Sequence, residues 1–210
     1  MSFSKKVKSI AIAISMMLLI TVPQSANAVA RGYESKWGNF TTKVYSGSGD
    51  DFVDLPKARR YGIIQVSHDG DSNFIVHSLD AGGDVIDYLV NEIGSVEATV
   101  TFGFGYFDPK TKSFEIQADG DWEIRVREVN KAPAYHRTGS GTTVMKYSAG
   151  QKRFRIRHSG ESNFIIWQHC TNGKSDLIVN VIGSYNGRKY LRSGKCVLEI
   201  KAEGPWSFTR

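Results

Sequence analysis

Four short segments of this chain occur twice in the same order, and this internal repeat constrains the fold more than any other sequence feature. The longest match reads His-Asp-Gly-Asp-Ser-Asn-Phe-Ile at residues 68–75 and His-Ser-Gly-Glu-Ser-Asn-Phe-Ile at residues 158–165. Such self-similarity predicts a tandem duplication of one folding unit, with copies at residues 33–131 and 132–210. The other matching pairs are 47–49 with 139–141, 91–95 with 180–184, and 118–122 with 202–206.

Each copy is a series of short apolar or alternating segments separated by turn residues. Residues 122–127 read Trp-Glu-Ile-Arg-Val-Arg, so one face of the predicted strand is apolar and the other is polar. Short strands with turns about every 8–12 residues are typical of a β-sandwich or jelly roll. The sequence therefore predicts an all-β fold of two tandem antiparallel, jelly-roll-like β-sandwich modules, each with seven or eight strands. The strands expected in the first copy are residues 40–45, 61–67, 73–79, 85–93, 96–102, 113–118 and 122–129.

The repeated segments also carry a resemblance to known proteins. The cues are His-x-Gly-x-Ser-Asn-Phe at residues 68–74 and 158–164, and Ala-x-Gly-x-Trp at residues 118–122 and 202–206. By these cues the chain resembles small repeated β-sandwich modules of secreted proteins from Gram-positive bacteria. The resemblance implies a β-sandwich fold and a location outside the cytoplasm, and it implies no particular activity.

The N-terminus has the three parts of a secretory signal peptide. Three lysines precede an apolar run at residues 10–22, and residues 26–28 read Ala-Asn-Ala, a small-x-small cleavage site. A retained membrane anchor is disfavoured because thirteen helical residues rise about 20 Å, less than the roughly 30 Å of a bilayer core. We predict a signal peptide at residues 1–28, no transmembrane segment after cleavage, and a mature protein that is extracellular or associated with the cell surface.

The chain has only two cysteines, Cys170 and Cys196, and both lie in the second copy. Two cysteines in an exported protein usually pair, so the sequence predicts one disulfide bond. Closing a loop of about 25 residues stabilises a fold by roughly 3 kcal/mol in the chain-entropy description. The alternative is a pair of free thiols.

The two copies differ sharply in charge. Residues 31–131 contain 11 Lys and Arg against 17 Asp and Glu, a net charge of −6. Residues 132–210 contain 13 Lys and Arg against 4 Asp and Glu, a net charge of +9. A module that folds with either sign of charge does not need that charge for folding, so the asymmetry points to partners or to contact between the modules.

The positive charge of the second copy follows a strand pattern. Arg153, Arg155 and Arg157 alternate with apolar residues, so their side chains are expected on one face of a strand. The matching residues of the first copy are Ile63, Gln65 and Ser67. Further cations on a later hairpin, predicted after a turn at Asn186-Gly187, are Arg188, Lys189, Arg192 and Lys195.

Three interpretations of this basic surface are open. It is a solvated face with local ion pairs, an interface with the acidic first module, or a site for an anionic polymer. Such a polymer could be a wall teichoic acid, an acidic glycan, lipid head groups or extracellular DNA. Nucleic acid is the weakest member of that set, since the sequence has no recognised nucleic-acid-binding motif.

One aromatic residue also suggests binding. Trp167 stands where the first copy has His77, so the fold does not require an indole there. The strand pattern places Trp167 and His169 on the same face. Two roles are open for Trp167, a sugar-stacking platform or a core residue, because indole rings are mostly buried.

No motif in the sequence identifies a reaction. Gly-x-Ser-x-Gly, His-Glu-x-x-His, P-loop and dinucleotide-binding motifs are all missing. His68 and His158 suit either a hydrogen bond around a hairpin turn or a catalytic or metal-binding role, and we favour the hydrogen bond. Asp69 and Asp71 resemble the start of a calcium loop, but its later glycine and glutamate are missing, which leaves only an irregular site. We predict no cofactor, no metal site and no catalytic residue.

The predicted function is that of a secreted, non-catalytic protein whose basic second module binds an anionic polymer or glycan of a cell envelope. One alternative is self-assembly, in which acidic and basic modules of different molecules associate head to tail. Others are a membrane-active toxin, suggested by Phe-Gly-Phe-Gly-Tyr-Phe at residues 102–107, and a hydrolase. The predicted ligand-binding residues are Arg153, Arg155, Arg157, Trp167, His169, Arg188, Lys189 and Arg192.

Overall fold

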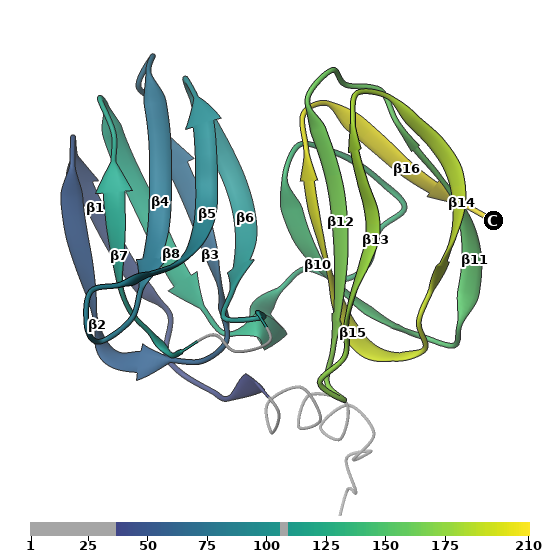
Figure 1. Cartoon of the computed structure of the whole chain (residues 1–210), viewed down its shortest axis with the longest axis horizontal. Helices are drawn as coiled ribbons and strands as arrows, with labels where there is room; N and C mark the ends of the chain where they lie inside the picture. The colour runs from purple at the N-terminus through teal and green to yellow at the C-terminus, as the bar shows by residue number, and fades with distance from the viewer. Residues whose placement is uncertain (1–36, 106–108) are drawn as a thin grey trace, which may run out of the picture.

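Two β-sandwiches follow one another along the chain (Figure 1). The computed structural model describes residues 37–105 and 109–210, and the predicted signal peptide at residues 1–28 lies outside them. The elements in this part are sixteen strands and one 3₁₀ turn, η1 (Val129–Lys131). The predicted all-β fold with two tandem sandwich modules is therefore confirmed. No helix of the described residues is long and apolar enough to cross a membrane.

The first sandwich consists of two four-stranded antiparallel sheets. Sheet A has the strand order β1-β8-β3-β6, and sheet B has the order β2-β7-β4-β5. The strands are β1 (Lys43–Ser48), β2 (Asp51–Arg59), β3 (Gly62–His68), β4 (Asn73–Leu79), β5 (Val85–Ile93), β6 (Val96–Phe102), β7 (Thr111–Gln117) and β8 (Asp121–Arg127).

The second sandwich repeats this topology strand for strand. Sheet D has the order β9-β16-β11-β14 and corresponds to sheet A, while sheet C has the order β10-β15-β12-β13 and corresponds to sheet B. The repeat seen in the sequence is therefore a repeat of the whole fold. The strands are β9 (Thr138–Ser140), β10 (Thr143–Ala149), β11 (Lys152–His158), β12 (Asn163–Cys170), β13 (Ser175–Ile182), β14 (Tyr185–Leu191), β15 (Gly194–Ala202) and β16 (Pro205–Thr209).

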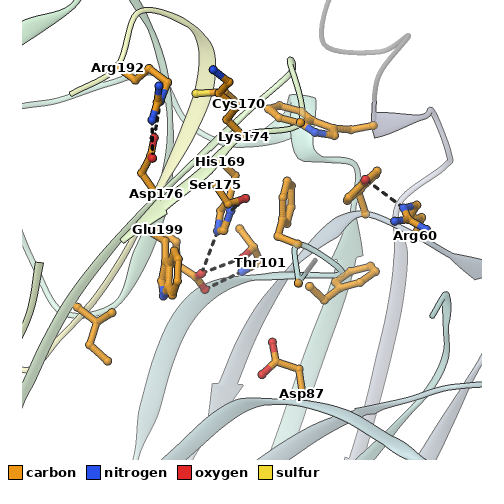
Figure 2. Close-up of a pocket in the computed structure, with 18 of the residues that line it drawn as sticks. Arg60, Asp87, Thr101, His169, Cys170, Lys174, Ser175, Asp176, Arg192 and Glu199 are labelled. Carbon is orange, nitrogen blue, oxygen red and sulfur yellow. Dashed lines mark hydrogen bonds and ion pairs between the residues drawn. The ribbon is translucent and has the colours of Figure 1, made fainter. Parts of the chain in front are cut away.

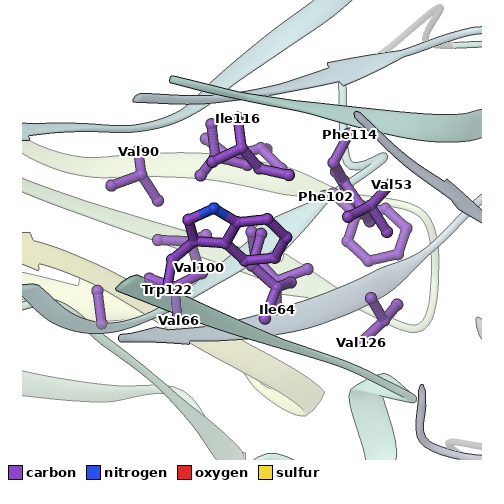
Figure 3. Packing of buried hydrophobic residues seen from close by; sticks show 14 of the residues in the cluster. Val53, Ile64, Val66, Val90, Val100, Phe102, Phe114, Ile116, Trp122 and Val126 are labelled. Carbon is purple, nitrogen blue, oxygen red and sulfur yellow. The ribbon is translucent and has the colours of Figure 1, made fainter. Parts of the chain in front are cut away.

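Alternating apolar side chains of each pair of sheets fill the space between them. In the first sandwich, Trp122 lies among aliphatic residues of both sheets and Phe102 packs edge-on against Phe114 (Figure 3). Trp206 takes the place of Trp122 in the second core, and both indoles are buried. Burying an aromatic side chain of this size contributes roughly 1.5–3 kcal/mol, so these cores hold the fold together.

The repeated sequence segments pack against one another within each sandwich. The ring of His68 stacks on Phe74 at 4.6 Å, and its Nδ1 donates to the carbonyl oxygen of Gly94 at 3.0 Å. His158 makes the same two contacts in the second copy, at 4.3 Å and 3.1 Å. These histidines therefore hold a hairpin turn, in agreement with the hydrogen-bonding role favoured from the sequence.

Repeated glycines make room for the repeated tryptophans. A Cβ atom on Gly47 would lie 2.5 Å from the ring of Trp122, whose Nε1 donates to the carbonyl oxygen of Gly49 at 2.9 Å. Gly139 and Trp206 have the same arrangement in the second copy. Packing thus accounts for the recurrence of these glycines and tryptophans.

The strand expected at residues 40–45 is misplaced. It begins at Lys43, and it is followed by β2 (Asp51–Arg59), which the sequence did not predict. Strand β2 lies at the edge of sheet B, contains Pro56 and pairs irregularly with β7 between Asp54 and Arg59. An edge strand tolerates proline and charge, and these residues mask the apolar alternation.

The turn predicted at Asn186-Gly187 is also wrong, because both residues lie inside β14. Gly187 is opposite Ile156 of β11, and a Cβ atom there would lie 2.2 Å from the hydroxyl of Tyr185. Its role is to admit the tyrosine ring. Gly183, with φ of 85°, makes the actual turn between β13 and β14.

The two sandwiches contact each other directly. Strand β6, at the edge of sheet A, lies against β10 and β15 of sheet C. Sheet C therefore faces the first sandwich, whereas sheet D lies on the side away from it (Figure 1). A separate apolar cluster lies at this junction and consists of Trp37, Ile63, Val129, Ala132, Val144 and Val197.

Candidate functional site

The outer face of sheet D carries the predicted arginine stripe. Arg153, Arg155 and Arg157 are exposed, while the residues between them, Phe154 and Ile156, are buried in the core. Alternation along β11 thus places the three arginines on one face, as predicted from the sequence. Residues two apart on a strand are separated by about 7 Å, so the stripe presents positive charge at a regular spacing.

A fourth arginine extends the stripe sideways. Arg188 of β14 lies directly opposite Arg155, and Tyr190 lies opposite Arg153. The guanidinium of Arg153 sits 5.6 Å from the centroid of the Tyr190 ring, a cation–π contact that fixes it over an exposed aromatic ring. Like charges on directly opposite residues destabilise a sheet, so the Arg155–Arg188 pair costs the fold some stability. We refer to Arg153, Arg155, Arg157, Arg188 and Tyr190 as the arginine face.

Within residues 37–105 and 109–210, no carboxylate forms an ion pair with the arginine face. None of the four strands of sheet D contains an Asp or Glu residue. Among the described residues, no ion pair involves any of its four arginines. The face also points away from the acidic first module, so that module does not neutralise it within the molecule. In the described part of the chain, the structure thus shows neither a local ion pair on this face nor a contact between sheet D and the acidic module.

Two other predicted basic residues lie elsewhere. Lys189 is paired with Phe154, so it belongs to the opposite side of the sheet from Arg188 and reaches solvent because β14 is an edge strand. Arg192 follows β14 and forms a two-bond ion pair with Asp176, with N···O distances of 2.5 and 2.6 Å. The hydrogen bond from Arg192 lowers the pKa of the Asp176 carboxyl.

Arg192, Trp167 and His169 line a cleft between the two sandwiches (Figure 2). The cleft has a volume of about 900 Å³. The second sandwich contributes the outer face of sheet C and the turn before β13. The first contributes the end of β6, its following loop, part of β5, Trp37 and the turn between β2 and β3. The charged, polar and aromatic residues that line it include Arg60, Tyr61, Asp87, Thr101, Phe104, Trp167, His169, Lys174, Ser175, Asp176, Arg192, Glu199 and Lys201.

A buried carboxylate joins the two sandwiches at the floor of this cleft. Glu199 of β15 accepts hydrogen bonds from the backbone N–H and the hydroxyl of Thr101 in β6, at 2.9 and 2.8 Å. Burial alone would raise the pKa of Glu199. Interactions with His169, Lys201 and the Thr101 amide outweigh burial, and they hold that pKa below its usual value. Glu199 is therefore ionised at neutral pH, and its carboxylate links the two modules through its hydrogen bonds with Thr101.

His169 lies between this carboxylate and a hydroxyl. Its Nδ1 is 2.8 Å from Oγ of Ser175, and its Nε2 is 3.9 Å from Oε2 of Glu199. A hydroxyl, an imidazole and a carboxylate in line are the groups that activate a serine nucleophile. Here the carboxylate is beyond hydrogen-bond distance from the imidazole and already accepts two bonds from Thr101. The arrangement orients the exposed Ser175 hydroxyl rather than forming a complete catalytic triad.

The disulfide bond lies at the end of this cleft. Cys170 and Cys196 are directly opposite on β12 and β15 and are bonded to each other, which confirms the predicted disulfide. The turn that follows Cys170 is closed by backbone hydrogen bonds from Cys170 to Lys174 and from Gly173 to Cys170. The bond thus ties the turn that leads to Ser175 and Asp176, at the start of β13, to β15 of sheet C.

Sequence reasoning missed the half of the cleft that the first sandwich supplies. Phe104 packs with its ring centroid 4.4 Å from His169 and 5.1 Å from Tyr61. Nothing local in the sequence indicates that residue 104 meets residue 169, since the contact depends on how the modules pack. Phe102 is a core residue. The first two aromatic residues of the segment proposed as a membrane-active hairpin are therefore engaged within the protein.

Asp69, which begins the calcium-like segment, serves a turn. It accepts a hydrogen bond from the N–H of Asp121, and Asp80 likewise accepts from the N–H groups of Gly82 and Asp84 in the next turn. Across residues 37–105 and 109–210, no three His, Cys, Asp or Glu side chains are grouped so that they could hold a metal ion.

By its fold, the chain is a tandem two-module β-sandwich protein. No protein-family model and no curated protein matches it. Among solved structures, the stem and receptor-binding domain of the spike protein P1 from bacteriophage PM2 is similar to 80% of this chain and 77% of that chain. The sequence identity is 8% and the TM-score is 0.20. A similarity this low carries no argument about function.

Proposed function

We propose that this is an exported, non-catalytic binding protein whose arginine face contacts an anionic polymer of a cell envelope. The observation that carries the proposal is the absence of any carboxylate on the four strands of sheet D, beside four exposed arginines. Two of these arginines, Arg155 and Arg188, are directly opposite each other. A sheet that keeps this destabilising pair gains from an anion that the protein itself does not provide.

The shape of the face favours a polymer over a small anion. The arginines lie on neighbouring strands of one exposed face, not in a buried pocket, so each alone binds an anion weakly. A chain with regularly spaced negative charges engages several of them at once, and their contributions combine. The guanidinium groups also suit phosphate and carboxylate, because they form two parallel hydrogen bonds with either group.

Export is part of the proposal. It is supported by the signal-like residues 1–28 and by the Cys170–Cys196 disulfide, since disulfides persist in oxidising compartments. A protein released outside the cytoplasm meets the anionic polymers of a cell envelope, which brings the proposed ligand within reach.

The test replaces Arg153, Arg155 and Arg157 together with glutamine and measures retention of the purified mature protein on immobilised teichoic acid. We expect the variant to lose retention and to unfold at the same temperature or a slightly higher one, because it also removes the repulsion between Arg155 and Arg188. Retention of the unaltered protein should fall steeply with added salt, because the screening length is about 10 Å at 0.1 M. Retention that is equal for both proteins and insensitive to salt would refute the proposal.

Size measurement on the same samples addresses self-assembly. If acidic and basic modules associate head to tail, the protein forms concentration-dependent oligomers at low salt without any added polymer. A monomer at all concentrations, together with salt-sensitive retention on teichoic acid, supports the binding function.

A further inference from the structure

We propose that the cleft between the two sandwiches binds a short stretch of neutral oligosaccharide. The cleft is separate from the arginine face, because it lies on sheet C and the arginine face lies on sheet D. It is therefore a second site, and it differs from the first in both its charge and its shape.

The size and the aromatic lining of the cleft suit sugar rings. Its volume of about 900 Å³ lies within the range of about 300–1,000 Å³ that is usual for small-ligand sites. Trp167 is only partly buried, and its ring is nearly parallel to that of His169, with an interplanar angle of 11°. Tyr61 and Phe104 enter the cleft from the first sandwich. A pyranose ring has apolar C–H faces that pack on such aromatic surfaces.

The polar groups of the cleft suit hydroxyls more than a charged ligand. Four cationic and three anionic side chains line it, so no large net charge attracts ions of one sign. Arg192 and Asp176 neutralise each other, and His169 orients the Ser175 hydroxyl. Neighbouring sugar hydroxyls both donate and accept hydrogen bonds, and a paired guanidinium and carboxylate offer both partners side by side.

The first copy of the fold has no tryptophan at the position that matches Trp167. The first sandwich has His77 at this position, almost fully buried and bonded to Glu115 through Nδ1 at 2.8 Å. Glu115 corresponds to Glu199, so both copies keep the carboxylate and only the second has the indole. The indole is found where a second module closes the cleft over it, which is the place where it gains a ligand-binding role.

The experiment titrates the mature protein with chitotetraose and cellotetraose, two neutral tetrasaccharides, and with tetragalacturonate as the acidic counterpart. Calorimetry and tryptophan fluorescence are the readouts. We expect at least one neutral tetrasaccharide to bind with little dependence on salt. The Trp167→His variant, which installs the residue found in the first sandwich, should bind it at least tenfold more weakly and unfold at an unchanged temperature. Asp176→Asn should also weaken binding, since it removes the negative charge and one of the two oxygens that accept from Arg192.

Two outcomes would overturn the cleft proposal. One is that neither neutral tetrasaccharide binds at millimolar concentration, whether or not tetragalacturonate does. The other is that Trp167→His and Asp176→Asn bind as tightly as the unaltered protein. Retention on teichoic acid is measured in parallel on the same variants, so failure of the cleft and failure of the arginine face are told apart.

Discussion

The outer faces of sheets A and D occupy the same position in the two copies of the fold, yet they are built for different surroundings. On sheet A, Glu123 and Arg125 form an ion pair, and Arg127 donates to Gln65. On sheet D, Ser207 and Thr209 of β16 stand where β8 has Glu123 and Arg125. One face is neutralised by its own residues, and the other leaves its arginines uncompensated.

This difference teaches how a duplicated fold acquires a binding surface. The buried histidine and tryptophan of each copy make the same hydrogen bonds to glycine carbonyl groups, and these contacts hold each sandwich together. The outer faces contribute little to the core, so they are free to diverge. Packing between the modules still constrains one position of these outer faces. Ile63 matches Arg153 but is fully buried at the junction of the modules, whereas Arg153 is exposed.

The disulfide gives the sharpest test of how far the copies differ in stability. The turn after β4 is held by the side chain of Asp80, whereas the equivalent turn after β12 is held by Cys170 and Cys196. Replacing both cysteines with serine should destabilise the second sandwich by about 3 kcal/mol, the value for a loop of this length. Urea unfolding measures this effect when the amide hydrogen exchange of each sandwich is used as the readout. Equal loss of protection in both sandwiches would show that they unfold as one unit.

A smaller effect is expected from giving sheet D the carboxylates of sheet A. Asn186 and Ser207 match Glu97 and Glu123, so Asn186→Glu with Ser207→Glu transfers the neutralised pattern. The new carboxylates lie opposite Arg157, and retention on teichoic acid should weaken by about 10- to 100-fold, or roughly 1.4–2.8 kcal/mol. The unfolding temperature should stay the same or rise slightly. Unchanged retention would mean that the polymer does not depend on the uncompensated charge.

The sequence predicts the parts of this molecule that follow a local rule. Alternation placed Arg153, Arg155 and Arg157 on one face, and the repeat predicted two equal modules. Pairing across strands is not local, so the opposition of Arg155 and Arg188 became visible only in the fold. The cleft could not be predicted from local sequence patterns, because it depends on how the two modules pack. Thr101 and Glu199, which meet there, are 98 residues apart. The turn predicted at Asn186-Gly187 was wrong for a similar reason. Gly187 is needed because the ring of Tyr185 packs over it, and the chain does not change direction there.

The stability contributed by the Glu199–Thr101 contact between the modules should depend on pH. The pKa of Glu199 is lower in the folded protein than its usual value, so the ionised carboxylate stabilises the fold above the unfolded-state pKa of about 4.3. This contribution is lost as the pH falls through the folded-state pKa. Glu199→Gln should therefore destabilise the protein by about 1–2 kcal/mol at neutral pH, and the difference should shrink on acidification. Denaturant unfolding of both proteins at several pH values measures it, and a difference that does not change with pH would contradict this role.

The smallest effect is predicted at the opposed arginines, and its sign distinguishes a binding surface from a structural one. Arg188 matches Thr99 of the first copy, so Arg188→Thr replaces it with a residue that the fold already accepts there. Removing one of two like charges on opposite residues should raise the unfolding free energy by about 0.2–1 kcal/mol. The gain should disappear at high salt, which screens exposed charges. The same variant should be retained less on teichoic acid, so a change that improves stability would impair binding. If Arg188→Thr instead lowers stability at every salt concentration, the arginines serve the sheet itself, and the contrast between sheets A and D would not reflect a polymer-binding role.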